Sequence, residues 1–184
     1  MAELNKRILG IDPGTNVMGY ALLEIRQNKP VLQHVGVVKT GGMENHYMRL
    51  RYIFIRTQAL ITEYQPSELA IESPFFGKDI QAMLKLGRAQ GIVMGLALSH
   101  DISVFEYAPL KVKQAITGMG RASKEQVAYF LQNTMKLNDL PKELDATDAI
   151  AVAVCHYLQA KNPVTKGQYK NWSDFIRKNP ERLK

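Results

Sequence analysis

The sequence contains a single cysteine, Cys155, among its 184 residues. One cysteine excludes both an intrachain disulfide and a metal site built from several thiolates. Cys155 lies within an apolar run, where a free cysteine usually serves as a small core residue. The sequence also has no internal repeat and no low-complexity segment, which excludes solenoid and fibrous architectures.

Long hydrophobic runs are lacking as well. The longest uncharged apolar stretch, Gly91–Leu98, is far shorter than the roughly 20 residues that a membrane-spanning helix needs. The N-terminus, Met1-Ala-Glu-Leu-Asn-Lys-Arg, has no apolar core of the kind found in signal peptides. We therefore expect a soluble, cytoplasmic protein with no membrane partner.

The net charge is +7, and it is unevenly distributed. Residues 161–184 contain seven Lys or Arg against two acids, which leaves a charge of only +2 for the rest of the chain. A basic balance favours a polyanionic partner such as nucleic acid, although cytosolic proteins of similar charge often bind none. We expect one folded domain at 1–160 followed by a basic, flexible tail at 161–184.

Apolar periodicity and turn residues predict the order of the elements. Ser123 and Gln126 have the spacing of a capping box, followed by an apolar helix face of Val127, Phe130, Leu131 and Met135. The pattern predicts strands at about 7–12, 18–25, 31–39, 69–72 and 103–107, and helices at 46–64, 79–99, 109–118, 123–135 and 141–160. This order is typical of an α/β fold with a mixed five-stranded sheet flanked by helices.

Four acidic residues stand out from their surroundings. Asp145 and Asp148 are three residues apart, so they share one face of an apolar helix. Asp12 and Glu72 each end a short apolar strand. Parallel central strands would bring their carboxyl ends, and hence Asp12 and Glu72, together at one edge of the sheet.

Four converging carboxylates would bind hard divalent cations. Oxygen-only ligands select Mg²⁺ or Mn²⁺, and four carboxylates offset roughly the charge of two such ions. A pair of ions stabilises the attacking and leaving oxygens of phosphodiester hydrolysis without a nucleophilic side chain. Taken singly, each acid also has a structural explanation: Asp12 as a turn residue before Pro13, Glu72 as a surface charge, Asp148 as the partner of a loop.

Several motifs together resemble the RuvC family of Holliday-junction resolvases, in the family's order and over residues 7–160. The resemblance implies a ribonuclease-H-like fold, a homodimer, and magnesium-dependent paired nicking of four-way DNA junctions in recombination and repair. It implies that Asp12, Glu72, Asp145 and Asp148 are the catalytic and metal-binding residues. The motifs are Ile8-Leu-Gly-Ile-Asp-Pro-Gly-Thr, Ala70-Ile-Glu-Ser-Pro-Phe, Leu84-Lys-Leu-Gly-Arg-Ala-Gln-Gly, Val104-Phe-Glu-Tyr-Ala-Pro with Val112-Lys-Gln, and Asp145-Ala-Thr-Asp-Ala-Ile-Ala.

Other residues are candidates for DNA contacts. Phe75 and Phe76 follow Glu72 in a loop, where one aromatic ring could enter the base stack of a distorted junction while the other anchors the loop. The resemblance aligns Phe75 with the family's stacking residue, and Lys113 and Lys124 with its basic positions near the cut strand. Phosphate contacts are further expected from Arg121, and as weaker candidates from Lys78, Lys85 and Arg88.

A strip of glycines, Gly87, Gly91 and Gly95, recurs every four residues in the predicted 79–99 helix. Such a strip permits close approach, either against the sheet or across a twofold axis. The resemblance implies a dimer contact through this helix, and a branch-migration complex of the RuvA and RuvB type as a partner. A twofold dimer suits a four-way junction, which needs two symmetric cuts.

Three other functions compete with this hypothesis. An actin-like sugar kinase or ATPase also ends its first strand in an Asp-x-Gly-Thr loop, but such proteins use two lobes around the nucleotide. A catalytically silent DNA-binding module would need only the basic charge and the aromatic loop. A related ribonuclease-H-like nuclease acting on another DNA or RNA structure differs only in its substrate.

Overall fold

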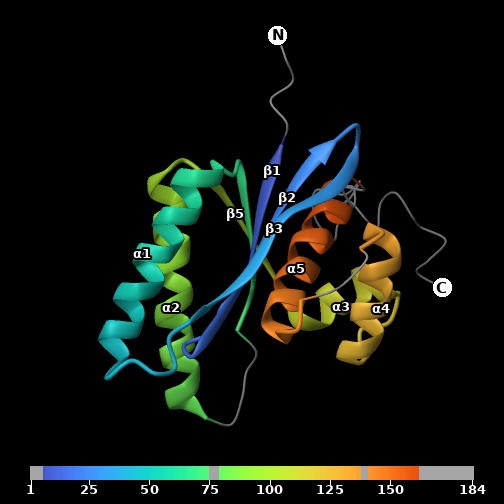
Figure 1. The fold of residues 1–184 in the computed structure, drawn as a ribbon. Helices are drawn as coiled ribbons and strands as arrows, with labels where there is room; N and C mark the ends of the chain where they lie inside the picture. The colour runs from blue at the N-terminus through green and yellow to red at the C-terminus, as the bar shows by residue number, and fades with distance from the viewer. Residues whose placement is uncertain (1–5, 75–78, 138–140, 162–184) are drawn as a thin grey trace, which may run out of the picture.

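The computed structural model describes residues 6–74, 79–137 and 141–161. Within these ranges the chain forms one five-stranded sheet with helices on both faces (Figure 1). The strands are β1 (Arg7–Asp12), β2 (Val17–Arg26), β3 (Lys29–Lys39), β4 (Glu68–Glu72) and β5 (Ser103–Tyr107). The helices are α1 (His46–Tyr64), α2 (Ile80–Ser99), α3 (Pro109–Thr117), α4 (Lys124–Met135) and α5 (Leu144–Lys161).

The strand order is β3-β2-β1-β4-β5. β1, β2 and β3 form an antiparallel meander, whereas β4 pairs parallel with β1 and β5 parallel with β4. Helices α1 and α2 cover one face of the sheet, and α5 with α3 and α4 covers the other (Figure 1). The mixed sheet flanked by helices confirms the predicted ribonuclease-H-like α/β fold.

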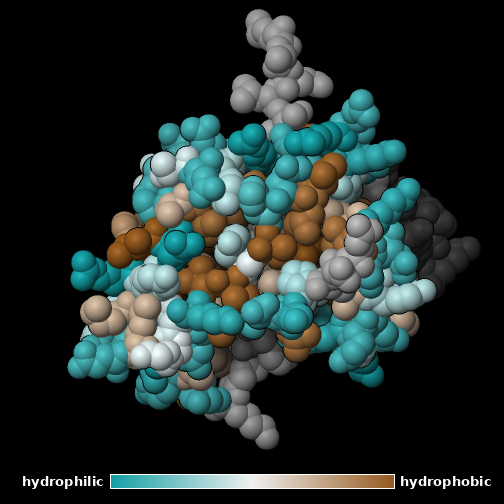
Figure 2. Space-filling view, viewed as in Figure 1, coloured by the Kyte–Doolittle hydropathy of each residue, from teal (hydrophilic) through white to brown (hydrophobic). Residues whose placement is uncertain are grey.

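The alternation of side chains along β1 and β4 divides the core into two parts. Leu9 and Ile11 point toward α1 and α2, whereas Ile8 belongs to the cluster under α5. Because the period is two, Asp12 and Glu72 lie on the α5 face of their strands. Figure 2 shows apolar side chains on both sides of the β3 edge strand, framed by hydrophilic residues.

Most predicted elements are confirmed, some with shifted ends. α1 spans the predicted residues, and the capping box of α4 forms through Ser123 and Gln126. The predicted inclusion of Phe130 in the apolar face is wrong, because it is 38% exposed. Val127 and Leu131, four residues apart, occupy the buried face, while Phe130 packs edge-on against Tyr129.

The predicted start of the last helix at residue 141 is also wrong. α5 begins at Leu144, so Pro141 precedes the helix and does not occupy its first turn. Glu143 lies just before the helix, where its carboxylate binds the Lys39 ammonium at 3.2 Å. Its carbonyl accepts a hydrogen bond from the backbone N–H of Thr147, at 3.4 Å.

The glycine strip of α2 does not pack against the sheet. A Cβ atom added at Gly87, Gly91 or Gly95 would meet no atom within 4 Å. The predicted alternative in which this strip packs against the sheet is therefore wrong, and the strip faces outward. It continues an exposed apolar face that includes Ile80 and Leu84.

Two other glycines let α5 lie directly on the sheet. A Cβ at Gly10 would come within 2.4 Å of the Ala149 carbonyl oxygen and 2.6 Å of the Ala153 Cβ. A Cβ at Gly19 would come within 1.9 Å of the Asp145 carbonyl oxygen. Gly19 also pairs with Asp12 across β1 and β2. The first turn of α5 is thus fixed level with the end of β1.

No helix among the described residues is long and apolar enough to cross a membrane. The tail predicted at 161–184 lies outside the described residues apart from Lys161, which ends α5. The domain boundary placed at residue 160 therefore stays a prediction.

Replacing Gly19 by alanine should destabilise the protein. The added methyl would overlap the backbone of Asp145 and push α5 off the sheet, at a cost of about 1–3 kcal/mol or more. Urea unfolding measures this loss. The control is Gly42→Ala, whose Cβ meets nothing within 4 Å. Equal stability of the two variants would contradict the close contact between β2 and α5.

Candidate active site

The topology gathers the predicted acidic residues at one end of the sheet. β1 and β4 run parallel, and Asp12 and Glu72 lie one position beyond the paired residues Ile11 and Ile71. α5 begins at the same end, because its first turn contacts Gly19, the partner of Asp12 in β2. The carboxyl ends of the parallel strands therefore meet the N-terminal turn of α5.

Three of the four predicted acids line one hollow of about 290 Å³. Asp12 comes from β1, Glu72 from β4 and Asp148 from α5. Lys113 of α3 and Lys124 of α4 also line the hollow, and its apolar wall is formed by Pro109, Val112, Val127 and Ala151. Acidic side chains, two lysines and a partly apolar wall thus surround a space that is open to solvent.

Asp12 has the most perturbed carboxyl group of this site. Burial, followed by the negative charges of Glu72, Asp148 and Asp145, raises its pKa from 3.8 to about 8. The positive charge of Lys124 acts in the opposite direction. Asp12 therefore lies at the centre of the negative field that the four acids create.

Glu72 is perturbed for similar reasons. Burial and then the charge of Asp148 raise its pKa from 4.5 to about 7, while Lys124 and Lys113 lower it. Two neighbouring carboxyl groups with raised pKa values indicate more negative charge than the two lysines neutralise. Such a site favours the arrival of additional positive charge.

Within the described parts of the chain, Lys124 forms the one direct ion pair with these acids. Its Nζ lies 2.5 Å from Oδ2 of Asp148, and this hydrogen bond raises the pKa of Lys124. The lysine is the first residue of α4, directly after the Ser123 cap. The helix face with the two predicted acids thus receives a cation from another helix.

Asp145 takes a different position from the other three acids. It contributes to the field at Asp12 but does not line the hollow. As the side chains lie, no three His, Cys, Asp or Glu residues in the described parts of the chain are close enough to share an ion. The four acids still fit a hard divalent cation, because every ligand atom would be a carboxylate oxygen and the nearby lysines neutralise only part of the negative charge.

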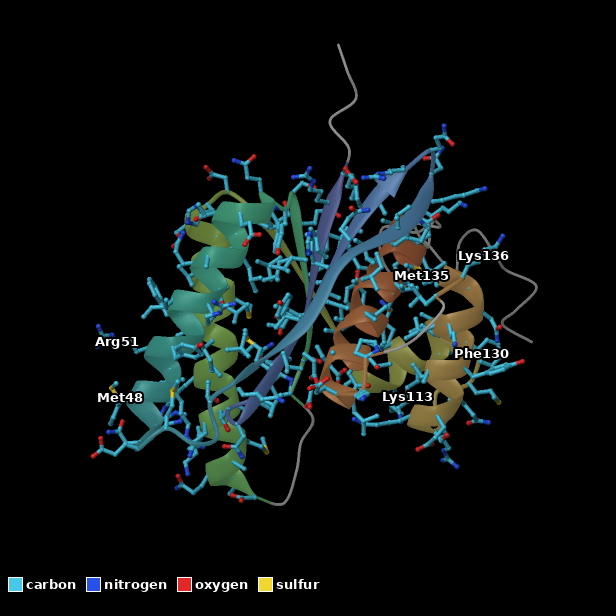
Figure 3. All side chains as sticks on the ribbon, viewed as in Figure 1. Met48, Arg51, Lys113, Phe130, Met135 and Lys136 are labelled. Carbon is cyan, nitrogen blue, oxygen red and sulfur yellow. The ribbon has the colours of Figure 1, made fainter. Side chains whose placement is uncertain are left out.

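The predicted DNA contacts fall into three groups. Lys113 and Lys124 line the hollow, and Figure 3 shows Lys113 on α3 beside the lower end of α5. Arg121 is exposed in the segment between α3 and α4, outside the hollow. Phe75, Phe76 and Lys78 lie outside the described residues, so their roles stay predictions.

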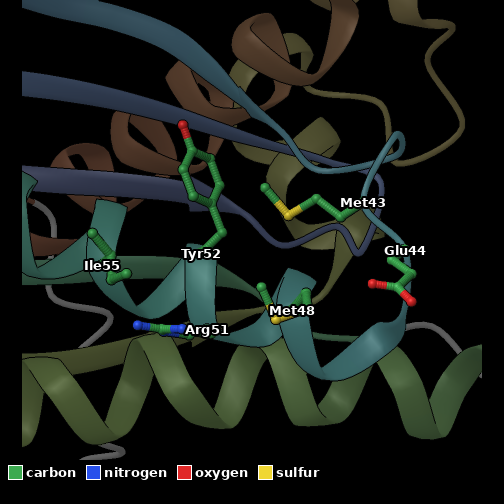
Figure 4. Close-up of a pocket in the computed structure, with 6 residues that line it drawn as sticks. All are labelled: Met43, Glu44, Met48, Arg51, Tyr52 and Ile55. Atoms are coloured by element: carbon green, nitrogen blue, oxygen red, sulfur yellow. The ribbon is translucent and has the colours of Figure 1, made fainter.

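A second hollow lies on the outer surface of α1, on the opposite face of the sheet from α5 (Figures 3 and 4). Its only acidic residue is Glu44, among mainly apolar neighbours. It is lined by Met43, Glu44, Met48, Arg51, Tyr52 and Ile55. One exposed carboxylate offers no acid pair, so this surface does not have the chemistry of the first hollow.

The sequence did not predict that Lys124 pairs directly with a catalytic candidate. The available signal was its place beside a capping box, which fixes the start of α4 but not the direction of that helix. The apolar wall formed by Val112 and Val127 was also missed, because it depends on how α3 and α4 pack against α5.

Comparisons with known proteins agree with this geometry. Residues 8–156 match the family model described as crossover junction endodeoxyribonuclease RuvC. The chain is 54% identical to the Bacteroides fragilis protein of that name over 97% of this chain and 96% of the relative. It is 50% identical to the Porphyromonas gingivalis protein of the same name, with both chains covered completely.

The fold is also similar to that of solved structures. Thermus thermophilus RuvC in complex with a Holliday-junction substrate has a TM-score of 0.80 at 31% identity, over 86% of this chain and 96% of that one. The yeast mitochondrial resolvase Ydc2 has a TM-score of 0.65 at 13% identity, covering 88% of this chain and 82% of its own, which shows a shared fold only. With acidic residues from β1, β4 and α5 at one end of this fold, and with these matches along its length, the chain belongs to the RuvC family of crossover junction endodeoxyribonucleases.

Proposed function

We propose that this protein is a structure-specific endonuclease that resolves four-way DNA junctions by paired, metal-dependent nicks. The observation that carries the proposal is the hollow where Asp12, Glu72 and Asp148 meet two lysines, in a chain that belongs to this family. The relatives at 50–54% identity are named as crossover junction endodeoxyribonucleases. The solved T. thermophilus relative contains a Holliday-junction substrate.

The residues of the site have separable tasks. Asp12 and Glu72 supply carboxylates from rigid strand ends, while Asp148 and Asp145 supply them from the first turns of α5. Lys124 forms an ion pair with Asp148 in the free protein. When a DNA phosphate enters the hollow, Lys124 and Lys113 bind its oxygens, and the apolar wall limits the access of bulk water.

The acids would hold Mg²⁺, with Mn²⁺ as a substitute and two ions in each site. Divalent ions bound there supply an acidified water for attack on phosphorus and a positive charge for the departing 3′ oxygen. Asp12, Glu72, Asp145 and Asp148 are the proposed ligands, and binding requires the raised pKa values of Asp12 and Glu72 to fall. The ammonium group of Lys124 then leaves its ion pair with Asp148 and pairs with a substrate phosphate.

The competing functions receive less support. A sugar kinase or ATPase of the actin type needs two lobes, whereas the described residues form one sheet that matches nearly the full length of the nuclease relatives. A silent DNA-binding module would not need buried carboxylates with raised pKa values. A nuclease for another DNA or RNA structure is not favoured, since the relatives at 50–54% identity are crossover junction endodeoxyribonucleases.

We further propose that the protein acts as a homodimer through α2. Ile80, Leu84 and Leu98 are 68%, 52% and 60% exposed on this helix. The glycine strip adds open space beside them, which would let a second backbone approach closely. A twofold dimer supplies the two active sites that symmetric cuts require.

The remaining predictions extend beyond the described residues. Phe75 is proposed to enter the base stack at the junction centre, with Phe76 anchoring the loop and Lys78 contacting the backbone. A branch-migration complex of the RuvA and RuvB type is the proposed partner, and the cytoplasm, where DNA is accessible in bacteria, the proposed location. No role is assigned to the basic tail.

Replacing Asp148 by asparagine should abolish nicking and spare binding. The change removes one carboxylate charge without changing the shape of the side chain, so we expect the single-turnover cleavage rate to fall by at least roughly 100-fold. The measurement uses a synthetic four-way junction in magnesium buffer. Glu143→Gln, an exposed acid just before α5, is the control. Retained cleavage by the Asp148 variant would refute its assigned role.

Replacing Asp12 by asparagine should stabilise the metal-free protein relative to the wild type, and this difference should grow as pH rises. The folded state retains the Asp12 proton up to about pH 8, whereas the unfolded chain loses it near pH 4. Ionisation therefore lowers the free energy of unfolding of the wild type as pH rises through this range. Asparagine does not ionise, so the free energy of unfolding of the variant should exceed that of the wild type by on the order of 2 kcal/mol at pH 8.

The measurement is urea unfolding in EDTA at pH 5.5, 6.5 and 8. The gain of Asp12→Asn should grow over this series and shrink when Mg²⁺ is added. Glu143→Gln is the control, because Lys39 lowers the pKa of Glu143 and keeps it ionised throughout. A gain that is the same at all three values of pH would show that Asp12 titrates normally.

Introducing a charge at Gly91 should separate the dimer. Gly91→Glu adds an exposed carboxylate to the centre of the α2 strip, where the folded monomer has free space. We expect the dimer dissociation constant to rise at least about tenfold, measured by sedimentation equilibrium. Ile55→Glu, on the exposed surface of α1, is the matched control. A dimer unaffected by Gly91→Glu would remove α2 from the interface.

A further inference from the structure

A group of basic residues lies on the face of the sheet opposite α5, and we call it the α1–α2 basic cluster. It consists of His46 and Arg49 of α1 with Lys85 and Arg88 of α2. Burial lowers the pKa of His46 first, and the positive charges of Arg88, Lys85 and Arg49 lower it further. All three cations are therefore close enough to act on one imidazole ring.

The topology places this cluster at the same end of the sheet as the carboxylates. β3 runs parallel to β1, because each is antiparallel to β2. α1 follows β3 and α2 follows β4, so both helices begin where Asp12 and Glu72 end their strands. The sheet separates the two sites, with the hollow on the α5 face and the cluster on the other.

No ion pair among the described residues neutralises this cluster. None of the ion pairs among residues 6–74, 79–137 and 141–161 involves its four members. Asp79 caps α2 and balances the positive end of that helix dipole, whereas α1 is capped by Asn45 and has no acidic residue in its first turn. The N-terminus of α1 and three permanent cations thus create one positive field.

Arg49 ties the cluster to the loop that follows Asp12. Its guanidinium donates to the Asn16 side chain and to the carbonyl oxygen of Gly41, the latter at 3.2 Å. The backbone N–H groups of Thr40 and Gly41 donate in turn to the Asn16 carbonyl, at 2.8 and 3.0 Å. The position of the cluster relative to the active site is therefore fixed by hydrogen bonds.

Two polar atoms of the cluster lack a partner. His46 Nε2 and Arg49 Nε are buried, and neither forms a hydrogen bond. An unpaired buried polar atom costs roughly 1–3 kcal/mol, so such atoms are uncommon without a functional reason. Their location within a positive field indicates that an anion completes the site.

We infer that the α1–α2 basic cluster binds a DNA backbone phosphate of the junction, away from the phosphate that is cut. The inference rests on the proposed function and adds a second contact region to it. Because the sheet lies between the two sites, one phosphate cannot occupy both. The cluster therefore orients a neighbouring part of the junction across the end of the sheet, and contributes affinity without base readout.

The test compares two double variants with the same loss of charge. Lys85→Ala/Arg88→Ala removes two cluster residues, and Arg51→Ala/Arg56→Ala removes two exposed arginines of α1 outside the cluster. Binding to a synthetic four-way junction is measured in EDTA over a series of salt concentrations. The cluster variant should bind about 10-fold or more weakly, with the slope of log K against log salt reduced by about one for each cluster that loses its phosphate.

The control variant should change the dissociation constant by less than about threefold. Equal effects of the two variants would overturn the inference while leaving the proposed function intact, since wild-type protein would still prefer the junction. If wild-type protein binds the junction no better than plain duplex, both the inference and the proposed function fail.

His46 provides a readout that a general loss of charge would not move. A phosphate among the three cations reverses the field at the ring, so junction binding should raise the pKa of His46. NMR titration of the imidazole signals with and without junction measures this, with the other three histidines of the chain as internal references. An unchanged His46 would place the phosphate elsewhere.

Discussion

The direct contact between α5 and the sheet is the constraint on which the site depends. Gly10 and Gly19 have no side chain where the backbone of α5 passes, so Ala149, Ala153 and Asp145 lie against the strands themselves. Any larger residue would lift the helix and move its carboxylates away from Asp12. The catalytic geometry is therefore set by packing between backbones, which varies less than contacts between long side chains.

Charge is arranged in opposite senses on the two faces of the sheet. On the α5 face, buried acids raise each other's pKa values and are only partly neutralised by lysines. On the α1–α2 face, cations accumulate without described acidic partners. The two regions share one end of the sheet because β1, β3, β4 and β5 all finish there. Divalent cations would neutralise the acids on the α5 face, and a polyanionic substrate would neutralise the cations on the α1–α2 face.

Much of the fold could be predicted from the sequence, because local signals agree with the final structure. The period of α1, the capping box of Ser123 and the apolar strand before Asp12 each depend on neighbouring residues only. The start of α5 was mispredicted, since Pro141 is compatible with a first helical turn but Glu143 binds Lys39, 104 residues away. The pairing of Lys124 with Asp148 depends likewise on the packing of α4, which no local pattern encodes.

The position of Lys124 has a consequence for reading mutational data. The lysine directly follows Ser123, whose hydroxyl accepts from the Gln126 N–H and defines where α4 begins. A substitution at Ser123 would let the helix start fray and carry the ammonium group away from Asp148. In a genetic screen, Ser123 would then score as a functional position, although its own side chain acts only by fixing the start of its helix.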